Sequence, residues 1–576
     1  MPFDFACPDW VEKLRRGEPP IAELDLDQAM ADRAVGIYDN LRLPDVLGTP
    51  TLGAAGGDWF RHLVRAAFGS ADPETGESRV REIFCLVPKK NSKTTNSAAM
   101  GLVALLMNKI PGAQLLIVGP TKDIAETCFN QARGMILADP PDPETGEAYL
   151  ANRFHISDTE MKITDRTNDA ALTVKTFSTK VITGKIPLVV IIEELHEMGT
   201  MAHAEAVLTE IRGGMITRPN TLLLFITTQS AEPPAGVFKS ELQFAREVRD
   251  GEVKGGTLLP CLYEFPEAMQ KAEGKPWRDP KHWPMVLPNL GRSITVERLA
   301  NLQAMAEKKG KEAAAGWATK HLNIQAGMGT HSGRWIGADL WPIAAGKFTL
   351  EELLTECDVV TVGIDGGGLD DLLGLGVIGR HRRTRNWHIW ARAWAQTEVL
   401  DKRKEIAPRL KDFEADGDLV MVPADDPTAD LRELAAICAD IHARGLFPES
   451  YGIGLDPYGI TALVDEMEQL GLSGDLLARV GQGTRLSPAV WGLERKLKDG
   501  TVRHAGQEML TWCVSNAKSE QRGGATLISK AVAGKAKIDP LIGVFNAAML
   551  MSRNPIAAGV GGSPWDDPDF SLSGGR

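Results

Sequence analysis

The sequence predicts an α/β protein built from at least two domains. Its 576 residues are too many for a single hydrophobic core. In the first half, short apolar runs alternate with segments compatible with helices, which predicts a parallel sheet covered by helices on both faces. In the second half, apolar runs follow one another through short turns, which predicts antiparallel strands.

The composition is that of an ordinary globular protein, with 43% hydrophobic and 24% charged residues. No apolar run approaches the roughly 18 to 20 residues that span a bilayer, and the start MPFDFACPDW lacks a signal-peptide pattern. We therefore expect a cytoplasmic protein that does not enter membranes. Seven cysteines without a CxxC pair predict reduced core thiols rather than a zinc site or disulfides. The net charge of -12 argues against a uniformly basic DNA-binding surface.

A first motif begins at the apolar run Ile83 to Val87. The run breaks into a polar turn that ends in Lys93 and Thr94, and a segment rich in Ala, Leu and Met follows. This strand, loop and helix order is that of a phosphate-binding P-loop. The pattern GxxxxGK[ST] expects glycine where Val87 and Ser92 stand, so a solvated basic turn that caps a helix is the alternative interpretation.

A second motif is the apolar run from Ile186, which ends in Glu193 and Glu194. Glu193 follows Lys93 by 100 positions (193 minus 93). A nucleotide hydrolase needs one carboxylate for magnesium and a second to orient the attacking water. A further run, Thr221 to Ser230, ends in hydroxyl and amide residues, and ligands bind at such strand ends. We therefore predict a P-loop NTPase domain, against the alternative of an ordinary buried strand that enters a charged loop.

Other segments of the first half fit around this domain. Helices are expected at Leu24 to Asn40 and at Gly56 to Gly69, and a strand followed by a helix is expected at Gln114 to Thr127. Alternation at Met161 to Thr164 and at Ala171 to Phe177 predicts a hairpin. The pair Trp59 and Phe60 indicates core packing, or else an aromatic contact with adenine.

Three carboxylates mark the second half. A strand ends at Asp365, a short strand ends at Asp456, and a helix carries Asp539 in its first turn, with spacings of 91 and 83 positions (456 minus 365; 539 minus 456). Such acids can converge on two divalent ions for in-line phosphodiester attack, which predicts a ribonuclease H-like nuclease domain. Each could instead be a turn or helix-start residue. Rival carboxylates are Asp370, Asp371, Asp425 and Asp426.

Taken together, these motifs resemble the large terminase subunits of tailed bacteriophages, the ATP-driven DNA packaging motors. VVIIEELHEM resembles the Walker B segment of that family, and FITTQS resembles its coupling motif. More specific matches are LPNLGRSI (Leu287 to Ile294), HLNIQ (His321 to Gln325) and RHAGQEMLTWCVSNA (Arg503 to Ala517), which KIDPLIG follows. The resemblance extends from about Trp59 to Met551.

The resemblance implies roles for individual residues. Lys93 would contact the nucleotide phosphates, Thr94 would hold magnesium, Glu193 would be the Walker B acid and Glu194 the catalytic glutamate. The expected nucleotide-binding residues are Lys89, Lys90, Ser92, Lys93, Thr94, Thr95 and Glu193. The expected catalytic metal ligands of the nuclease are Asp365, Asp456 and Asp539.

Some roles stay open at this point. The arginine that completes the ATPase site could be Arg133, Arg212 or Arg218, and it could come from a neighbouring subunit. The roles of Asp371, His504 and Asn516 are also open, and capping or packing is as good an interpretation for the last two.

The resemblance further implies cofactors, partners and a location. The cofactors would be ATP with Mg²⁺, and two divalent ions, Mg²⁺ or Mn²⁺, in the nuclease. The partners would be double-stranded DNA, the portal protein, the procapsid and the small terminase subunit, with a homo-oligomeric ring on the portal. The chain would act in the cytoplasm of the infected bacterial host and be absent from the mature virion.

Five segments are expected along the chain. They are an N-terminal appendage (1–50), a P-loop ATPase core (51–235), a lid or linker (236–345), a ribonuclease H-like nuclease domain (346–553) and a disordered tail (554–576). The predicted function is ATP-driven translocation of DNA into a procapsid with two-metal cutting of concatemeric DNA. The alternatives are a helicase or translocase fused to a nuclease that acts in restriction or repair, and a non-catalytic adaptor that binds DNA or capsid.

Overall fold

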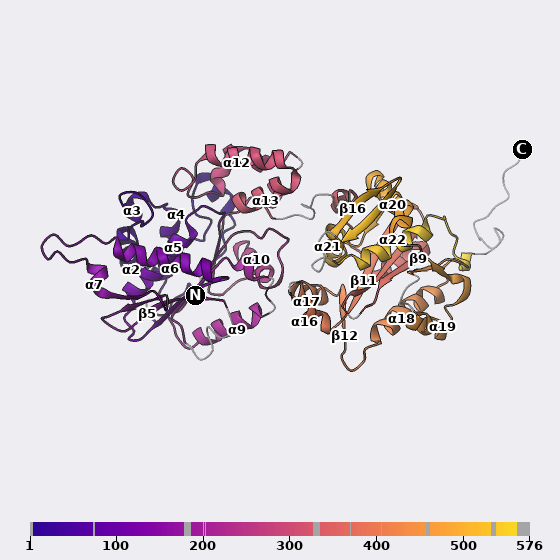
Figure 1. Ribbon diagram of the computed structural model, residues 1–576, viewed down its shortest axis with the longest axis horizontal. Helices are drawn as coiled ribbons and strands as arrows, with labels where there is room; N and C mark the ends of the chain where they lie inside the picture. The colour runs from indigo at the N-terminus through magenta and orange to yellow at the C-terminus, as the bar shows by residue number, and fades with distance from the viewer. Residues whose placement is uncertain are drawn as a thin grey trace, which may run out of the picture. The chain divides into compact units, whose positions relative to one another are not determined.

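The protein folds into two compact units, Met1–Gly327 and Met328–Arg576 (Figure 1). The computed structural model describes residues 4–72, 75–177, 186–199, 201, 203–272, 274–325, 335–368, 370–404, 406–456, 461–530 and 537–560. From residue 561 onward, the predicted tail lies outside the described residues.

Within the described residues, the first unit contains an eight-stranded sheet in the order β3-β4-β5-β2-β6-β7-β1-β8. Neighbouring strands from β5 to β8 in this order pair in parallel, and β3 and β4 add an antiparallel edge. The parallel sheet and the hairpin are therefore as predicted, whereas β3 and β8 were not expected. The strands are β1 (Glu82–Leu86), β2 (Gln114–Gly119), β3 (Phe154–Ser157), β4 (Lys162–Asp165), β5 (Ala171–Thr176), β6 (Val189–Glu193), β7 (Leu222–Thr227) and β8 (Leu258–Leu262).

Helices pack against this sheet because its central strands are apolar on both faces. Helix α5 contacts β2, β5, β6 and β7, and α10 contacts β1 and β8. The α-helices are α1 (Trp10–Arg16), α2 (Gln28–Asn40), α3 (Leu52–Ala55), α4 (Trp59–Gly69), α5 (Lys93–Met107), α6 (Lys122–Leu137), α7 (Tyr149–Arg153), α8 (Leu195–Met198), α9 (Ala204–Met215), α10 (Gly236–Arg249), α11 (Glu267–Lys271), α12 (Val296–Lys309) and α13 (Lys311–Leu322). Two short 3-10 helices are η2 (Pro276–Arg278) and η3 (Pro280–Met285).

The N-terminal segment packs into the core of the first unit. Helix α2 lies against α4 and α5, and the buried Tyr38 hydroxyl donates a hydrogen bond of 2.8 Å to Asn96 Oδ1 on α5. Near the start of the described chain, the Cys7 N–H donates to the Arg249 carbonyl at 2.8 Å. Residues that were expected to form an appendage therefore pack against α5, the helix that begins at Lys93.

The aromatic pair upstream of the loop is buried. Trp59 is 4% exposed and Phe60 is fully buried, and the Trp59 ring makes edge-to-face contacts with Phe60 and Tyr263. These contacts agree with the core-packing interpretation of the pair.

The second unit is built on a sheet in the order β12-β11-β10-β9-β13-β14, with β15 paired to β11. Strands β9, β10 and β11 are consecutive and antiparallel, as the short turns predicted, while β13 joins β9 in parallel. The strands are β9 (Cys357–Gly366), β10 (Leu372–His381), β11 (Trp387–Gln396), β12 (Leu419–Val422), β13 (Ile453–Leu455), β14 (Leu477–Arg479) and β15 (Val502–His504). A separate hairpin consists of β16 (Ala517–Arg522) and β17 (Ala525–Lys530).

Helices cover both faces of the second sheet, with α20, α21 and α22 on one side and α18 and α19 on the other (Figure 1). The α-helices are α14 (Gly337–Leu340), α15 (Leu350–Glu356), α16 (Glu398–Lys402), α17 (Ala407–Ala415), α18 (Ala429–Ala443), α19 (Thr461–Gln469), α20 (Ser487–Asp499), α21 (Glu508–Asn516) and α22 (Asp539–Met551). The 3-10 helices are η4 (Trp341–Ala344), η5 (Gly474–Leu476), η6 (Gly483–Leu486) and η7 (Ala558–Val560).

Glycines allow α22 to lie directly on this sheet. A Cβ at Gly363 or at Gly376 would overlap the backbone of α22 at Gly543 and Val544. The helix therefore rests on bare backbone of β9 and β10. This close approach brings Asp539, the first residue of α22, next to the end of β9.

Two general expectations can be compared with the structure. Over the residues described, no helix is both long and apolar enough to cross a membrane. The seven cysteines are all buried, and none forms a disulfide. They are Cys7, Cys85, Cys128, Cys261, Cys357, Cys438 and Cys513.

Candidate nucleotide and nuclease sites

The loop after β1 forms the turn of a P-loop without its glycines. Lys90 and Ser92 adopt left-handed backbone conformations, with φ of 72° and 58°. Glycine enters this region without steric cost, whereas residues with a Cβ do so rarely. Helix α5 then begins at Lys93, so Lys93, Thr94 and Thr95 form its first turn. Ser92 stands at an expected glycine position and Lys90 does not. Both nevertheless adopt the backbone conformation that glycine favours.

The sheet order brings the predicted ATPase motifs together. Strand β7 lies between β1, which precedes the loop, and β6, which ends in Glu193. The Val87 N–H donates to the Thr227 carbonyl at 2.9 Å, and the Glu194 N–H donates to the Ile226 carbonyl at 2.9 Å. The loop and the two acids are therefore both anchored to the end of β7, where parallel α/β sheets bind ligands.

Lys93 and Glu194 face each other at this edge of the sheet. The Lys93 Nζ lies 3.5 Å from Glu194 Oε1, and Lys93 is 7% exposed. Glu194 has a left-handed backbone with φ of 53°, which turns the chain sharply after β6. The predicted phosphate-binding lysine and the predicted catalytic glutamate thus lie next to each other.

Glu193 is a buried acid without a hydrogen bond. It is 2% exposed, and neither of its carboxylate oxygens has a partner of good geometry. Burial raises the pKa of Glu193 to about 7, against the lowering effect of the nearby Ser97 hydroxyl. Carboxylate and hydroxyl oxygens are the ligands that Mg²⁺ prefers, so this orphaned acid beside Thr94 fits a magnesium site.

His196 joins the second acid to the end of β7. The His196 Nδ1 lies 3.3 Å from Glu194 Oε2 and 3.0 Å from the Thr227 hydroxyl. The backbone N–H of His196 also donates to the Thr227 hydroxyl, at 3.1 Å. Sequence analysis did not single out His196. Its position two residues after Glu194 in EELHEM is the signal that could have suggested it.

Asn323, from the segment HLNIQ, links the residues that follow β7 and β8. Its Oδ1 accepts a hydrogen bond of 3.1 Å from the Gln229 N–H, and its Nδ2 donates to the Tyr263 carbonyl at 2.9 Å. Asn323 is fully buried, with a left-handed backbone at the end of α13. A segment singled out only by resemblance therefore holds the ends of β7 and β8 together.

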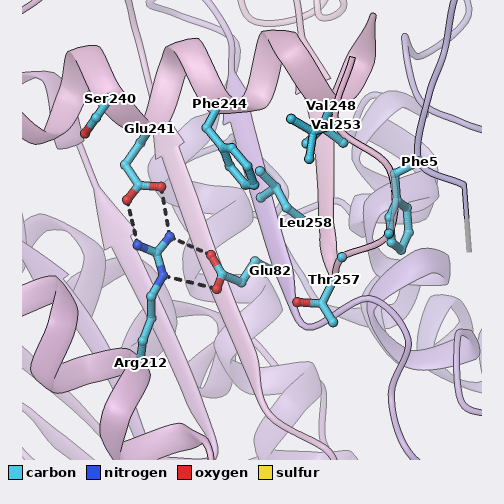
Figure 2. Close-up of a pocket in the computed structure, with 12 residues that line it drawn as sticks. Phe5, Glu82, Arg212, Ser240, Glu241, Phe244, Val248, Val253, Thr257 and Leu258 are labelled. Carbon is cyan, nitrogen blue, oxygen red and sulfur yellow. Dashed lines mark hydrogen bonds and ion pairs between the residues drawn. The ribbon is translucent and has the colours of Figure 1, made fainter. Parts of the chain in front are cut away.

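One of the three candidate arginines is remote from this site in its own chain. Arg212 lies between Glu82 and Glu241, with bonds of 2.7 Å to an oxygen of each (Figure 2). Glu82 is the first residue of β1, whereas the loop follows the last. Arg212 therefore sits at the opposite edge of the sheet, beside a cavity of about 410 Å³ that Phe5 and Phe244 help to line.

The other two arginines are less constrained by their contacts. Arg133 pairs with Asp158 at 3.0 Å on the surface, and the Arg218 carbonyl accepts a hydrogen bond from Arg81. Neither contact selects one of them as the arginine that completes the ATPase site.

The three predicted nuclease acids line one cleft of the second unit. Asp365, Asp456 and Asp539 border a cleft of about 350 Å³ together with Gln482 and Lys530. Burial raises the pKa of Asp365 to about 8, helped by the charges of Asp539 and then Asp456. Burial likewise raises the pKa of Asp539 to about 7, and the Asp371 charge adds to this effect. Two acids distant in sequence therefore lie close enough to Asp365 to raise its pKa.

Two lysines contact the acids in this region, Lys530 from the lining of the cleft and Lys537 from beside it. Lys530 Nζ lies 3.1 Å from Asp371 Oδ2 and 3.5 Å from Asp539 Oδ1, and Lys537 Nζ lies 2.6 Å from Asp371 Oδ1. Although burial opposes the effect, Lys537 and Lys530 lower the pKa of Asp371. Asp371 is therefore engaged by cations, and sequence analysis identified neither lysine.

The acids suit divalent ions by their chemistry. Asp539 Oδ2 is buried and has no hydrogen-bond partner, and hard carboxylate oxygens suit Mg²⁺ or Mn²⁺. In the part of the chain that the structure describes, no three His, Cys, Asp or Glu side chains stand close enough to hold a metal ion. The acids thus line the cleft without forming a closed ligand set, and Lys530 supplies a positive charge among them.

The remaining rival carboxylates have other contacts or surroundings. Asp370 pairs with Arg403 at 2.7 Å, and Asp426 pairs with Arg432. Asp425 is exposed. None of the three lines the cleft.

Two residues of the late block, Asn516 and His504, make hydrogen bonds within the second unit. The Asn516 side chain donates to the Lys537 carbonyl at 3.2 Å. His504 is 2% exposed, stacks on Trp341 with 4.1 Å between ring centroids, and has Nε2 2.9 Å from the Trp341 carbonyl. These contacts are structural for His504, and they make Asn516 a support for the segment that carries Lys537.

Two amides missed by sequence analysis, Asn546 and Gln482, link α22 to the end of β9. Asn546 is fully buried and donates to the Ile364 carbonyl at 2.9 Å, directly before Asp365. Gln482 lines the cleft and donates to Asn546 Oδ1 at 3.1 Å. This chain of hydrogen bonds fixes the end of β9 relative to α22.

Comparisons with known proteins identify both domains. Two family models match the chain, the terminase large subunit ATPase domain at residues 58–247 and the terminase large subunit endonuclease domain at residues 263–554. The protein YmfN of Escherichia coli K12 is 23% identical over 385 residues, which cover 64% of this chain and 79% of YmfN. The terminase large subunit of Enterobacteria phage HK97 is 23% identical over 464 residues, which cover 79% of this chain and 81% of that protein.

A solved structure is also similar. The crystal structure of the HK97 bacteriophage large terminase matches with a TM-score of 0.45 and 19% identity, over 90% of this chain and 99% of that one. On the strength of the two family models, which confirm the resemblance predicted from the motifs, the chain belongs to the terminase large subunit family, with an ATPase domain followed by an endonuclease domain.

Proposed function

We propose that the ATPase of this chain works through Lys93, Thr94, Glu193 and Glu194 to drive double-stranded DNA into a procapsid, and that its endonuclease cuts with Asp365, Asp456 and Asp539. The observation that carries the nuclease assignment is that these three acids line one cleft, where burial and the charges of Asp539 and Asp456 raise the pKa of Asp365. The ATPase assignment is supported by the contact of 3.5 Å between Lys93 and Glu194 beside a buried, unpaired Glu193.

In the ATPase, this chain's residues bind, orient and accept charge. The first turn of α5 offers Lys93, Thr94 and Thr95 to the phosphates, with Lys89, Lys90 and Ser92 along the loop before it. Thr94 and Glu193 would hold Mg²⁺, which when bound neutralises charge on the phosphates. Glu194 orients the attacking water, and His196 Nδ1 lies 3.3 Å from Glu194 Oε2.

In the endonuclease, Asp365, Asp456 and Asp539 would hold two divalent ions, Mg²⁺ or Mn²⁺. Ions bound in this way supply an activated water and stabilise the leaving oxygen. The protein's own part is to keep the acids in place, since Asn546 fixes the strand end before Asp365 and α22 presents Asp539. Lys530 and Lys537 balance the negative charge at the rim.

We also infer the partners and the place of action. A motor must release DNA in every cycle, so the net charge of -12 suits modest phosphate contacts. Docking of a ring of copies on a portal protein, with the procapsid and a small terminase subunit, would supply the remaining affinity. This would happen in the cytoplasm of an infected bacterial host. In such a ring, Arg133 or Arg218 of a neighbouring copy could complete the ATPase site.

Two substitutions separate the activities. Glu194→Gln keeps the shape of the side chain but removes its charge, so ATP turnover should fall at least about 100-fold while plasmid cleavage persists. Asp365→Ala should do the reverse. The measurements are Mg²⁺-dependent ATP turnover and cleavage of supercoiled plasmid with Mg²⁺ or Mn²⁺.

The matched controls are Glu205→Gln and Asp425→Ala, which change exposed acids of the same two units. Both should keep both activities. If each active-site variant stayed folded but lost both activities, or lost neither, the two-site assignment would be wrong. Portal binding and procapsid filling by the purified chain test the packaging role separately, because a repair or restriction translocase would do neither.

A further inference from the structure

The unusual feature of the nucleotide loop is its left-handed backbone at residues with a Cβ. Ser92, directly before Lys93, has φ of 58° and ψ of 33°, and Lys90 has φ of 72°. The P-loop pattern places glycine at the position of Ser92, because glycine adopts this conformation freely. Something else in this chain must therefore stabilise the turn.

Asn289 makes the contacts that could stabilise it. Its backbone N–H donates to Asn91 Oδ1 at 3.0 Å, and its Nδ2 donates to the Ser92 hydroxyl at 3.0 Å. The same Nδ2 donates to the Ser293 hydroxyl at 2.7 Å, and Ser293 in turn donates to the Lys90 carbonyl. Each residue from Lys90 to Ser92 is thus tied to one short segment nearly 200 positions later, Asn289 to Ser293.

The Asn289 side chain is held in a fixed orientation. Asn289 is 4% exposed, and a Cβ at Gly57 would overlap its Oδ1 and crowd the indole of Trp59. The bonds that the Asn289 side chain makes are the two that Nδ2 donates to Ser92 and Ser293. A buried side chain with two such bonds is suited to stabilise a strained loop.

We propose that Asn289 is a positioning residue that keeps Ser92 in the left-handed conformation that glycine would adopt without help. In the structure, the Asn289 side chain contacts Ser92 and Ser293. It acts through Ser92, which sets the direction of the first turn of α5 and of Lys93. The inference rests on the proposed nucleotide site, and it explains why a loop without the expected glycine can still form that site.

The test is a double-mutant cycle between Asn289 and Ser92 in the full-length chain. The probe is the Mg²⁺ complex of a fluorescent, non-hydrolysable ATP analogue. Asn289→Ala should raise its Kd by roughly tenfold, because two hydrogen bonds to a strained loop are lost. The Ser92→Gly variant serves as its own reference, and in that background Asn289→Ala should raise the Kd by less than about threefold, because glycine adopts the left-handed conformation without help.

Rescue by glycine distinguishes positioning from ordinary packing. If Asn289 only filled space, its removal would cost the same in both backgrounds, and that result would overturn the proposal. An Asn289→Ala Kd within about twofold of wild type would also overturn it. In Asn289→Ala with Ser92 unchanged, the loop should lose only its orientation. The KM for ATP should therefore rise more than kcat falls.

Controls separate this idea from the proposed site itself. Lys93→Ala should abolish binding of the analogue in any background, and if it does not, the nucleotide site is misassigned. Asn168→Ala removes a hydrogen bond to the Asn108 carbonyl at the other edge of the sheet and should leave the Kd unchanged.

A second variant covers the case in which Asn289→Ala does not fold. Ser293 is exposed, and Ser293→Ala removes the link to the Lys90 carbonyl while Asn289 stays in place. The Kd should rise by about threefold. A wild-type Kd for this folded variant would contradict the proposed role of the Asn289 segment.

Discussion

Lys530 reaches Asp539 across the nuclease cleft, with 3.5 Å between Nζ and Oδ1. If the proposed divalent ions bind to Asp539, the Lys530 ammonium would compete with them for this carboxylate. Lys530→Ala should tighten Mn²⁺ binding by roughly threefold to tenfold, because a competing positive charge is removed. Isothermal titration of the chain with Mn²⁺ measures this directly, without reference to cleavage.

A matched control lies on the same hairpin. Lys518 pairs loosely with Glu520 at 3.9 Å, and Lys518→Ala should leave Mn²⁺ affinity unchanged. If Lys530→Ala instead weakened Mn²⁺ binding, Lys530 would have to support the acids rather than compete with the ion.

Arg212 is expected to contribute to stability rather than to ATP binding in its own chain. It bridges Glu82 and Glu241, as Figure 2 shows, and both acids would lose this partner in Arg212→Ala. The free energy of unfolding should fall by about 2 kcal/mol, at the low end for a broken buried pair because the guanidinium is partly solvated. Urea unfolding measures the loss, and the Kd of a fluorescent ATP analogue should not change. A large rise in that Kd for the isolated chain would contradict this placement.

His504 predicts a loss of stability in mild acid. Burial lowers the pKa of His504 to about 4, below the ordinary 6.5. The unfolded chain then binds more protons between these values, so the second unit should lose stability as pH falls from about 6.5 to about 4, by up to about 3 kcal/mol. His504→Gln should remove this part of the pH dependence. The measurement is the difference between the two unfolding curves across pH, and parallel curves would rule out His504 as the cause.

Gly376 is expected to be essential for the packing of α22. A Cβ at this position would overlap the backbone of Val544. Backbone atoms inside a helix cannot move away as a flexible side chain could. Gly376→Ala should lower the free energy of unfolding of the second unit by about 3 kcal/mol, with loss of DNA cleavage. Gly368→Ala is the control, because a Cβ there meets open space, and it should change stability by less than about 0.5 kcal/mol. Thermal unfolding of both variants decides the matter, and equal effects would refute the packing argument.

Local pattern was enough to predict the strands that lead to the candidate sites. Apolar runs that end in charged residues predicted the strands before Lys93, Glu193 and Asp365. Because such runs fix where a strand ends, they also fix which edge of the sheet receives the polar side chains. The convergence of Asp365, Asp456 and Asp539 followed from that logic and from the position of Asp539 at a helix start.

What local pattern could not supply are contacts between distant segments. The bond between Asn289 and Ser92 spans 197 positions, and the contact between Lys530 and Asp371 spans 159. No periodicity marks an asparagine or a lysine as the partner of a particular residue so far away. For the same reason, the packing of Tyr38 onto α5 was invisible, and the first 50 residues looked like an appendage.

The burial of all seven cysteines makes the chain convenient for optical experiments. Burial raises the pKa of Cys357 and of Cys438 to about 12, so these thiols are poor nucleophiles near neutral pH. A single cysteine introduced at an exposed position such as Asp425 should therefore react with a maleimide dye while the native thiols remain shielded. Fluorophores could be attached to either unit in turn, and the motor could be watched through a cycle without first replacing its own cysteines.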